Sequence, residues 1–240
     1  MPRVGEQGQS ALLNRRVLVV GAGGLGSPAA MYLAAAWVGF LRIIDPDSVE
    51  LSNLQRQLLY RTKDIGESKA ACARATLTAI NPDVTVEALT MRFTPENACD
   101  CLQDVDFVIE ATDSAVGTFA VAGACHDARL PYCYGGLTEF GGQVMTVLPG
   151  RTACIRCLFG SDVQPAAIDA ESPPGPLSPV PGIVGSTQAA EAVKFLIGIG
   201  TLLVNRLLIV DALGMSFRTV PVRPSADCPV CGGCSPAISV

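Results

Sequence analysis

The chain has 240 residues, of which 49% are hydrophobic and 16% charged, so it can bury a sizeable core and is not a disordered protein. Its net charge is −5 and it has no lysine- or arginine-rich run, so the sequence shows no basic segment for binding a nucleic acid, and no nucleic-acid partner is expected. The most apolar stretch, residues 29–44, is broken by Gly39 and Arg42 and is too short to span a bilayer. No signal-peptide pattern is present, so a cytoplasmic location without membrane contact is expected.

Short apolar runs alternate with helical patterns along the chain. Residues 1–14 predict an N-terminal helix. Buried strands are predicted at residues 17–20, 41–44, 84–88, 107–110, 131–134, 142–148 and 207–211. Helices are predicted at residues 27–37, 68–80, 115–128 and 186–196. This alternation is typical of βαβ units. It predicts a single α/β domain over residues 1–240, Rossmann-like, with a mostly parallel sheet and helices on both faces.

One segment has no regular pattern. Residues 165–181 contain six prolines, and such a segment is expected to be a long loop that crosses the surface over a functional site.

A glycine-rich turn follows the first apolar run, residues 17–20. Gly21 permits a tight turn, Gly23 lets the backbone approach a phosphate, and Gly26 allows the next helix to pack closely. Asp45, nineteen residues after Gly26, ends the second strand where it could hold ribose hydroxyls. The pattern indicates a nucleotide site, although a ligand-free turn or an NAD oxidoreductase would share it.

A polar cluster after this turn favours phosphate chemistry. Asn53, Arg56 and Lys69 provide an amide and two cations that could bind the phosphates of ATP and stabilise a pyrophosphate leaving group. Lys69 follows Gly66 at the expected start of a helix. No P-loop motif is present. The alternatives are that Arg56 is a surface cation and that Lys69 belongs to a solvated helix face.

Asp113 comes directly after the predicted strand 107–110. The carboxyl ends of parallel strands are where open α/β sheets bind ligands, so Asp113 could hold Mg²⁺ or contact the attacked phosphate. The alternative is that it caps the helix that begins at residue 115.

The cysteine spacing is an independent signal. Cys154 and Cys157 form one C-x-x-C knuckle, and Cys228 and Cys231 form a second. Four thiolates make a closed structural zinc site, which would fix the C-terminal tail to the domain. Cys234 creates a third C-x-x-C with Cys231, so the last ligand is open to argument, but Cys228 and Cys231 are favoured as the partners of Cys154 and Cys157. Unliganded or redox-active thiols are the alternative. Five further cysteines are expected to be buried fillers: Cys72, Cys99, Cys101, Cys125 and Cys133. His126, the only histidine, is expected to be structural.

Together these motifs resemble the MoeB/ThiF family, the bacterial relatives of ubiquitin-activating enzymes. The resemblance extends from Gly8 to Cys231. It rests on residues 20–26, 45–47, 51–57, 66–69, 111–113 and 182–188 and on the two knuckles. It implies an adenylyltransferase that uses ATP and Mg²⁺ to activate the C-terminal Gly-Gly carboxylate of a small ubiquitin-like sulfur-carrier protein as acyl-AMP, acting as a homodimer.

The resemblance and the motifs together assign the site residues. The nucleotide-binding residues are Gly21, Gly23, Gly24, Gly26, Asp45, Asp47, Ser52, Asn53, Arg56, Lys69, Asp113 and Ser114. The catalytic ones are Arg56 and Lys69 on the phosphates and Asp113 on magnesium and the α-phosphate.

Three positions depart from the family pattern. Glu171 stands where many relatives carry a cysteine, and no cysteine lies between Cys157 and Cys228. An enzyme thioester through the 165–181 loop is therefore not expected, and sulfur would come from a separate persulfide or sulfide donor. Ser114 and Thr118 replace the usual asparagine and arginine. Alternative functions are adenylation of another carboxylate, on a peptide, small molecule or modified tRNA base, and a catalytically silent scaffold.

Overall fold

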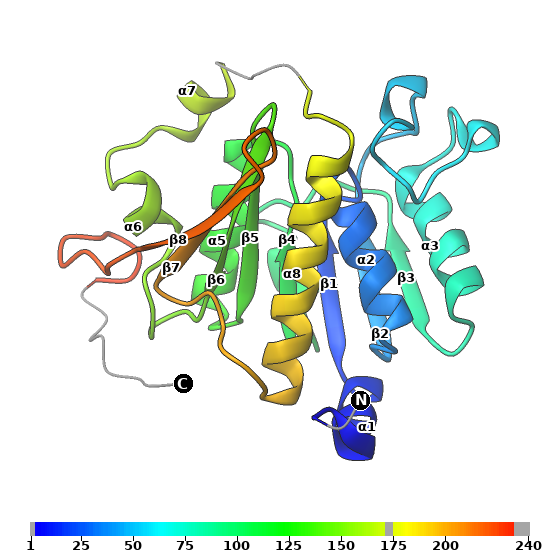
Figure 1. The fold of residues 1–240 in the computed structure, drawn as a ribbon, viewed down its shortest axis with the longest axis horizontal. Coiled ribbons are helices and arrows are strands. Elements are labelled where there is room, and N and C mark those ends of the chain that lie inside the picture. Colours follow the sequence, from blue (N-terminus) through cyan, green and yellow to red (C-terminus); the bar gives the residue numbers. More distant parts are fainter. Residues whose placement is uncertain (1–2, 171–174, 233–240) are drawn as a thin grey trace.

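The computed structural model describes residues 3–170 and 175–232. Its centre is an eight-stranded sheet with the order β3-β2-β1-β4-β5-β6-β7-β8 (Figure 1). The strands are β1 (Arg16–Val20), β2 (Phe40–Ile44), β3 (Thr85–Leu89), β4 (Phe107–Glu110), β5 (Tyr132–Leu137), β6 (Gly141–Val147), β7 (Arg206–Asp211) and β8 (Ser216–Pro221). The first five strands of this order are parallel, and the last three pairings are antiparallel.

Helices cover both faces of the sheet and bury a separate core on each (Figure 1). One face packs against α1 (Gly5–Leu13), α2 (Gly26–Ala35), α3 (Lys69–Ile80) and α8 (Pro179–Ile197). The other packs against α4 (Ala98–Leu102), α5 (Ala115–Asp127) and α6 (Ile155–Phe159), and α7 (Pro165–Asp169) lies against α5. Two 3-10 helices, η1 (Leu51–Asn53) and η2 (Thr62–Asp64), precede α3. Strand side chains alternate between faces, so the near-continuous apolar runs supply both cores.

The strand order places a switch point beside β1. The chain leaves β1 toward β2 and β3, and then returns to β4 on the other side of β1. Val20 pairs with both Ile44 and Glu110, so the turns after β1, β2 and β4 meet at one edge of the sheet. Ligands of open α/β sheets bind at such an edge, in the crevice between diverging connections.

The predicted Rossmann-like fold is confirmed, and the predicted strands differ from the observed ones by one or a few residues at their ends. One expectation is wrong, and another is confirmed only in part. Residues 165–181 do not form an irregular loop throughout, because α7 begins at Pro165 and α8 at Pro179; proline is well accommodated in the first turn of a helix. The helix expected at 186–196 is the second part of α8. In addition, β8 had not been predicted. Among the described helices none is long and apolar enough to cross a membrane.

Candidate active site

The glycine turn after β1 is too compact for side chains at two positions. Gly21 has φ +93°, and a Cβ on it would lie 2.4 Å from the Ala111 carbonyl oxygen. A Cβ on Gly26 would lie 1.8 Å from the Gly21 carbonyl oxygen. The turn therefore folds back on itself, between β4 and the start of α2, only with glycine at both positions.

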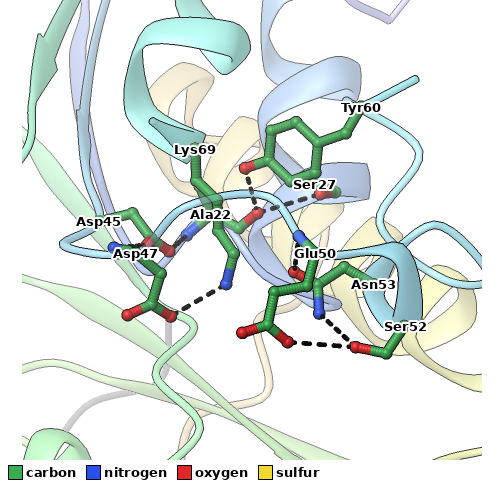
Figure 2. A network of polar contacts seen from close by, with 9 residues as sticks. All are labelled: Ala22, Ser27, Asp45, Asp47, Glu50, Ser52, Asn53, Tyr60 and Lys69. Atoms are coloured by element: carbon green, nitrogen blue, oxygen red, sulfur yellow. Dashed lines mark hydrogen bonds and ion pairs between the residues drawn. The ribbon is translucent and has the colours of Figure 1, made fainter. Parts of the chain in front are cut away.

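Asp45, at the end of β2, holds this turn in place (Figure 2). Its Oδ2 accepts a 2.7 Å hydrogen bond from the Ala22 amide, and its Oδ1 accepts one of 2.9 Å from the Asp47 amide. Burial raises the pKa of Asp45, while these two backbone hydrogen bonds lower it. The Ala22 carbonyl accepts hydrogen bonds from the hydroxyls of Tyr60, at 2.7 Å, and Ser27, at 3.1 Å. Each Asp45 oxygen keeps a lone pair for a ligand hydroxyl.

Lys69, the first residue of α3, points toward the same edge (Figure 2). Its side chain is 8% exposed and its Nζ lies 2.9 Å from Oδ2 of Asp47. Asp47 therefore orients the lysine.

The turn at η1 is fixed locally: the Glu50 amide donates to Oδ1 of Asn53 at 3.2 Å, and the Ser52 hydroxyl donates to Glu50 at 3.2 Å.

Two cavities open at this edge. The smaller, of about 320 Å³, is lined by Asp47, Ser48, Glu50, Asn53, Arg56, Gln57, Lys69 and Asp113. The larger, of about 870 Å³, extends from Gly21, Gly23, Gly24 and Asp45 past Ser114 to Ile209 and Val210 of β7. Ten of the twelve predicted nucleotide residues line one or both cavities. Gly26 and Ser52 line neither; Gly26 serves packing, and the exposed Ser52 bonds within its own turn.

Asp113 contributes an unengaged carboxylate to both cavities. The alternative, that it caps α5, is wrong, because the hydroxyl of Ser114 caps that helix by accepting from the Gly117 amide at 3.1 Å. Within residues 3–170 and 175–232, the Asp113 carboxylate has no hydrogen bond or ion pair. Among the same residues, the Arg56 guanidinium makes one hydrogen bond, of 3.1 Å, to the Ser52 carbonyl, which leaves most of its donors available.

Glu110, the last residue of β4, is a buried carboxyl that sequence reasoning missed. Its Oε1 accepts from the Thr112 amide at 2.9 Å and from the Thr112 hydroxyl at 2.6 Å. Burial raises its pKa to about 7. The sequence does carry one signal for this residue, namely a carboxyl group at the end of an otherwise apolar strand. Glu110 shapes the short connection from β4 to Asp113.

Asp169, the last residue of α7, was also missed. Its carboxylate accepts from the amides of Ala115, at 2.6 Å, and Val116, at 3.1 Å, at the start of α5. Ile168 and Asp169 line the larger cavity, so α7 lies over it, as expected for this segment. Glu171 lies outside the described residues.

Four cysteine sulfurs gather within the second core, the one on the face of the sheet covered by α4, α5 and α6. Cys154 Sγ lies 3.9 Å from Cys157 Sγ and 3.5 Å from Cys228 Sγ, and Cys157 Sγ lies 3.3 Å from Cys231 Sγ. All four atoms are within 4.8 Å of one another. A tetrahedral zinc site with Zn–S bonds of about 2.3 Å has sulfur–sulfur edges of about 3.8 Å. The predicted set therefore has the geometry of a four-thiolate metal site; Cys234 lies outside the described residues.

The other cysteines follow the prediction in part. Cys101, Cys125 and Cys133 are buried and Cys72 is partly buried, but Cys99 is exposed, so the expectation for it was wrong. Cys99 lies in the short helix α4, whose inner face is occupied by Cys101.

Comparison with known proteins agrees with this geometry. Residues 1–230 match the ThiF family. The sulfur carrier protein adenylyltransferase of Thermus thermophilus is 44% identical over 237 residues, which cover 97% of this chain and 88% of that protein. The SAMP-activating enzyme E1 of Haloferax volcanii is 43% identical over 232 residues, covering 97% and 86%. The crystal structure of Escherichia coli MccB has a TM-score of 0.83 at 24% identity, covering 94% of this chain and 69% of MccB; this likeness concerns the fold.

Proposed function

Because the chain belongs to the ThiF family, we propose that it transfers the adenylyl group of ATP to the C-terminal Gly-Gly carboxylate of a small ubiquitin-like sulfur-carrier protein. The two sequence relatives named above act, by their names, on a sulfur carrier and on SAMP. The observation that carries the proposal is the smaller cavity, where Arg56, Lys69 and Asp113 converge beside the glycine turn.

The chemistry is a displacement at phosphorus. A carboxylate oxygen of the carrier forms a bond to the α-phosphorus, the bond from that phosphorus to the bridging oxygen of the β-phosphate breaks, and pyrophosphate leaves. Negative charge grows on the leaving group, and Arg56 and Lys69 are positioned to stabilise it. Gly21, Gly23 and Gly24 line the adjoining cavity without side chains, which leaves room for phosphates against the backbone.

Asp113 is the residue that would hold Mg²⁺, because its carboxylate has no partner in the described part of the chain and the residue lines both cavities. Magnesium prefers oxygen ligands and substrate phosphates, and when bound it would offset phosphate charge. For the cysteine cluster we propose Zn²⁺, whose preferred ligand set and spacing it fits.

Three further parts of the proposal concern partners and location. A persulfide or sulfide donor would form a carbon–sulfur bond to the acyl carbon of the acyl-AMP, and the bond from that carbon to the AMP oxygen would break and release AMP. A separate donor is proposed because the chain has no cysteine between Cys157 and Cys228 that could form an enzyme thioester in the 165–181 segment. The chain exposes large apolar side chains at Tyr32, Leu51 and Leu58, which supports a homodimer and can be tested by light scattering. A cytoplasmic location stays a prediction from the sequence.

ATP–pyrophosphate exchange tests the activity. With small carrier proteins ending in Gly-Gly from the same genome, we expect carrier-dependent exchange. Arg56→Ala and Lys69→Ala should each lower it at least 100-fold, because each removes a charge-assisted contact made to the leaving group.

The matched controls are Arg74→Ala and Lys63→Ala, which remove exposed cations outside both cavities and should leave exchange unchanged. Absence of exchange with every carrier would contradict the proposed substrate. Mass spectrometry of acyl-AMP formed with peptides or small carboxylates would then identify a different acceptor.

A further inference from the structure

Gln57 is a buried side chain of the site that no step above uses. It is 4% exposed and lines both cavities. The backbone of Gln57 is fixed in a turn: its N–H donates to the Asn53 carbonyl at 2.9 Å, and its backbone carbonyl accepts from the Tyr60 N–H at 3.2 Å. Because the Tyr60 hydroxyl in turn donates to the Ala22 carbonyl, the turn that carries Gln57 is fixed against the glycine turn.

The side-chain amide of Gln57 lies where phosphates would approach that turn. Its Nε2 lies 3.6 Å from the position that a Cβ on Gly23 would occupy. Apart from the two chain neighbours of Gly23, no other described residue has a heavy atom within 4 Å of that position. The Oε1 of Gln57 is buried and has no hydrogen-bond partner among the described residues. A buried polar atom without a partner costs about 1–3 kcal/mol. A leucine would fill similar space without that penalty, so the free protein gains no stability from this amide.

Charge gives a reason for a neutral donor here. The smaller cavity contains the carboxylates of Asp47, Glu50 and Asp113, and Lys69 is already paired with Asp47. An amide N–H can donate to a phosphate oxygen without being drawn into such an ion pair.

Resting on the proposed function, we infer that Gln57 is a nucleotide-contacting residue whose side-chain amide donates a hydrogen bond to a phosphate oxygen of ATP above Gly23. Nε2 then donates to the phosphate only in the complex, while the buried Oε1, an acceptor like the phosphate oxygens, takes no part in this contact.

The test compares Gln57→Leu with Gln55→Leu, which changes an exposed glutamine two residues away. Binding of ATP and of adenosine, both with Mg²⁺, is measured by calorimetry or by displacement of a labelled nucleotide. Gln57→Leu should weaken ATP binding about 10- to 100-fold, the range for loss of a hydrogen bond to a charged group. It should leave adenosine binding unchanged and should not lower the melting temperature of the nucleotide-free protein. Gln55→Leu should match the wild type.

Two results would overturn the inference. One is that Gln57→Leu binds ATP as tightly as the wild type. The other is that it loses ATP and adenosine binding in parallel, which would indicate a merely structural role. Neither measurement uses a carrier. If the wild type binds ATP but supports no exchange, the proposed substrate is wrong. The role of Gln57 is then still decided by the nucleotide-binding measurements.

Discussion

Glu110 couples the stability of the protein to pH. Its carboxyl is fully buried, one oxygen is bonded to Thr112 and the other, Oε2, has no partner among the described residues. Burial raises its pKa from the ordinary value of 4.5 to about 7. Between these two values the folded protein therefore binds one more proton than the unfolded chain, and the free energy of unfolding falls as the pH rises.

We expect the contribution of Glu110 to fall by up to about 3 kcal/mol between pH 4.5 and pH 8. The change to test is Glu110→Gln, because the amide has nearly the same shape and does not titrate. Urea unfolding at pH 5 and pH 8 should show a smaller difference for Glu110→Gln than for the wild type. Glu67→Gln, at an exposed position, is the control and should retain the wild-type difference. If the free energy of unfolding changes by the same amount between pH 5 and pH 8 in all three proteins, the raised pKa of Glu110 is contradicted.

At the scale of elements, the contact between α7 and α5 decides how the larger cavity is covered. Asp169 accepts from the first two amides of α5, where unpaired N–H groups and the helix dipole favour a negative charge. Ile168 lies beside it on the cavity wall. The carboxylate thus fastens a segment 54 residues away in the chain to the helix that begins just after Asp113.

Asp169→Ala should release this segment. Loss of a cap of this kind costs about 0.5–2 kcal/mol, so we expect faster cleavage within residues 160–178 in limited proteolysis and little change in global unfolding. Asp162→Ala removes an exposed carboxylate from the same segment and should be cleaved like the wild type. Equal cleavage of all three proteins would show that other contacts hold α7 in place.

The same elements show what local sequence signals can and cannot predict. Alternating apolar runs and helical patterns were sufficient for β1 to β5 and for the glycine turn, because each is determined by residues close in sequence. Prolines suggested a loop at 165–181, although Pro165 and Pro179 occupy first-turn positions in helices. Strand β8 is mostly exposed and has no apolar periodicity to detect. The Asp169 cap depends on a long-range contact that no local pattern encodes.

At the scale of the whole molecule, the cysteine cluster connects two distant parts of the chain. Cys154 and Cys157 flank the start of α6, and Cys228 and Cys231 follow β8 by seven residues or more. A bound Zn²⁺ would join the tail to the second core and contribute to folding. The cluster lies apart from both cavities, so its effect should be on stability.

We expect about one zinc ion per chain by elemental analysis. Cys228→Ser should lose it and lower the melting temperature by at least about 5 °C, which corresponds to a few kcal/mol for a domain of this size. Cys99→Ser, at an exposed cysteine outside the cluster, should keep both zinc and stability. A zinc-free wild type, or a Cys228→Ser protein with unchanged melting temperature, would contradict a structural zinc site.

The sheet also places an apolar surface at the edge that carries the candidate active site. Strand β7 runs parallel to β1, since two successive antiparallel pairings separate it from β5. The hairpin between β7 and β8 therefore turns at the same edge as the glycine turn (Figure 1). It exposes Leu213, Met215 and Phe217, with 71%, 67% and 53% of each residue accessible. Exposed apolar groups of this kind mark protein contacts.

A carrier bound at this hairpin could extend its C-terminus along the larger cavity, which reaches from β7 to the glycine turn. Met215→Asp should then raise the carrier concentration needed for half-maximal ATP–pyrophosphate exchange at least 10-fold, because a charge in an apolar contact must be desolvated. ATP affinity should not change, since Met215 lines neither cavity. Ile80→Asp, at the exposed C-terminal end of α3, provides the same charge at the opposite edge and should have no effect on the carrier. If both variants respond to carrier like the wild type, the carrier docks on another surface.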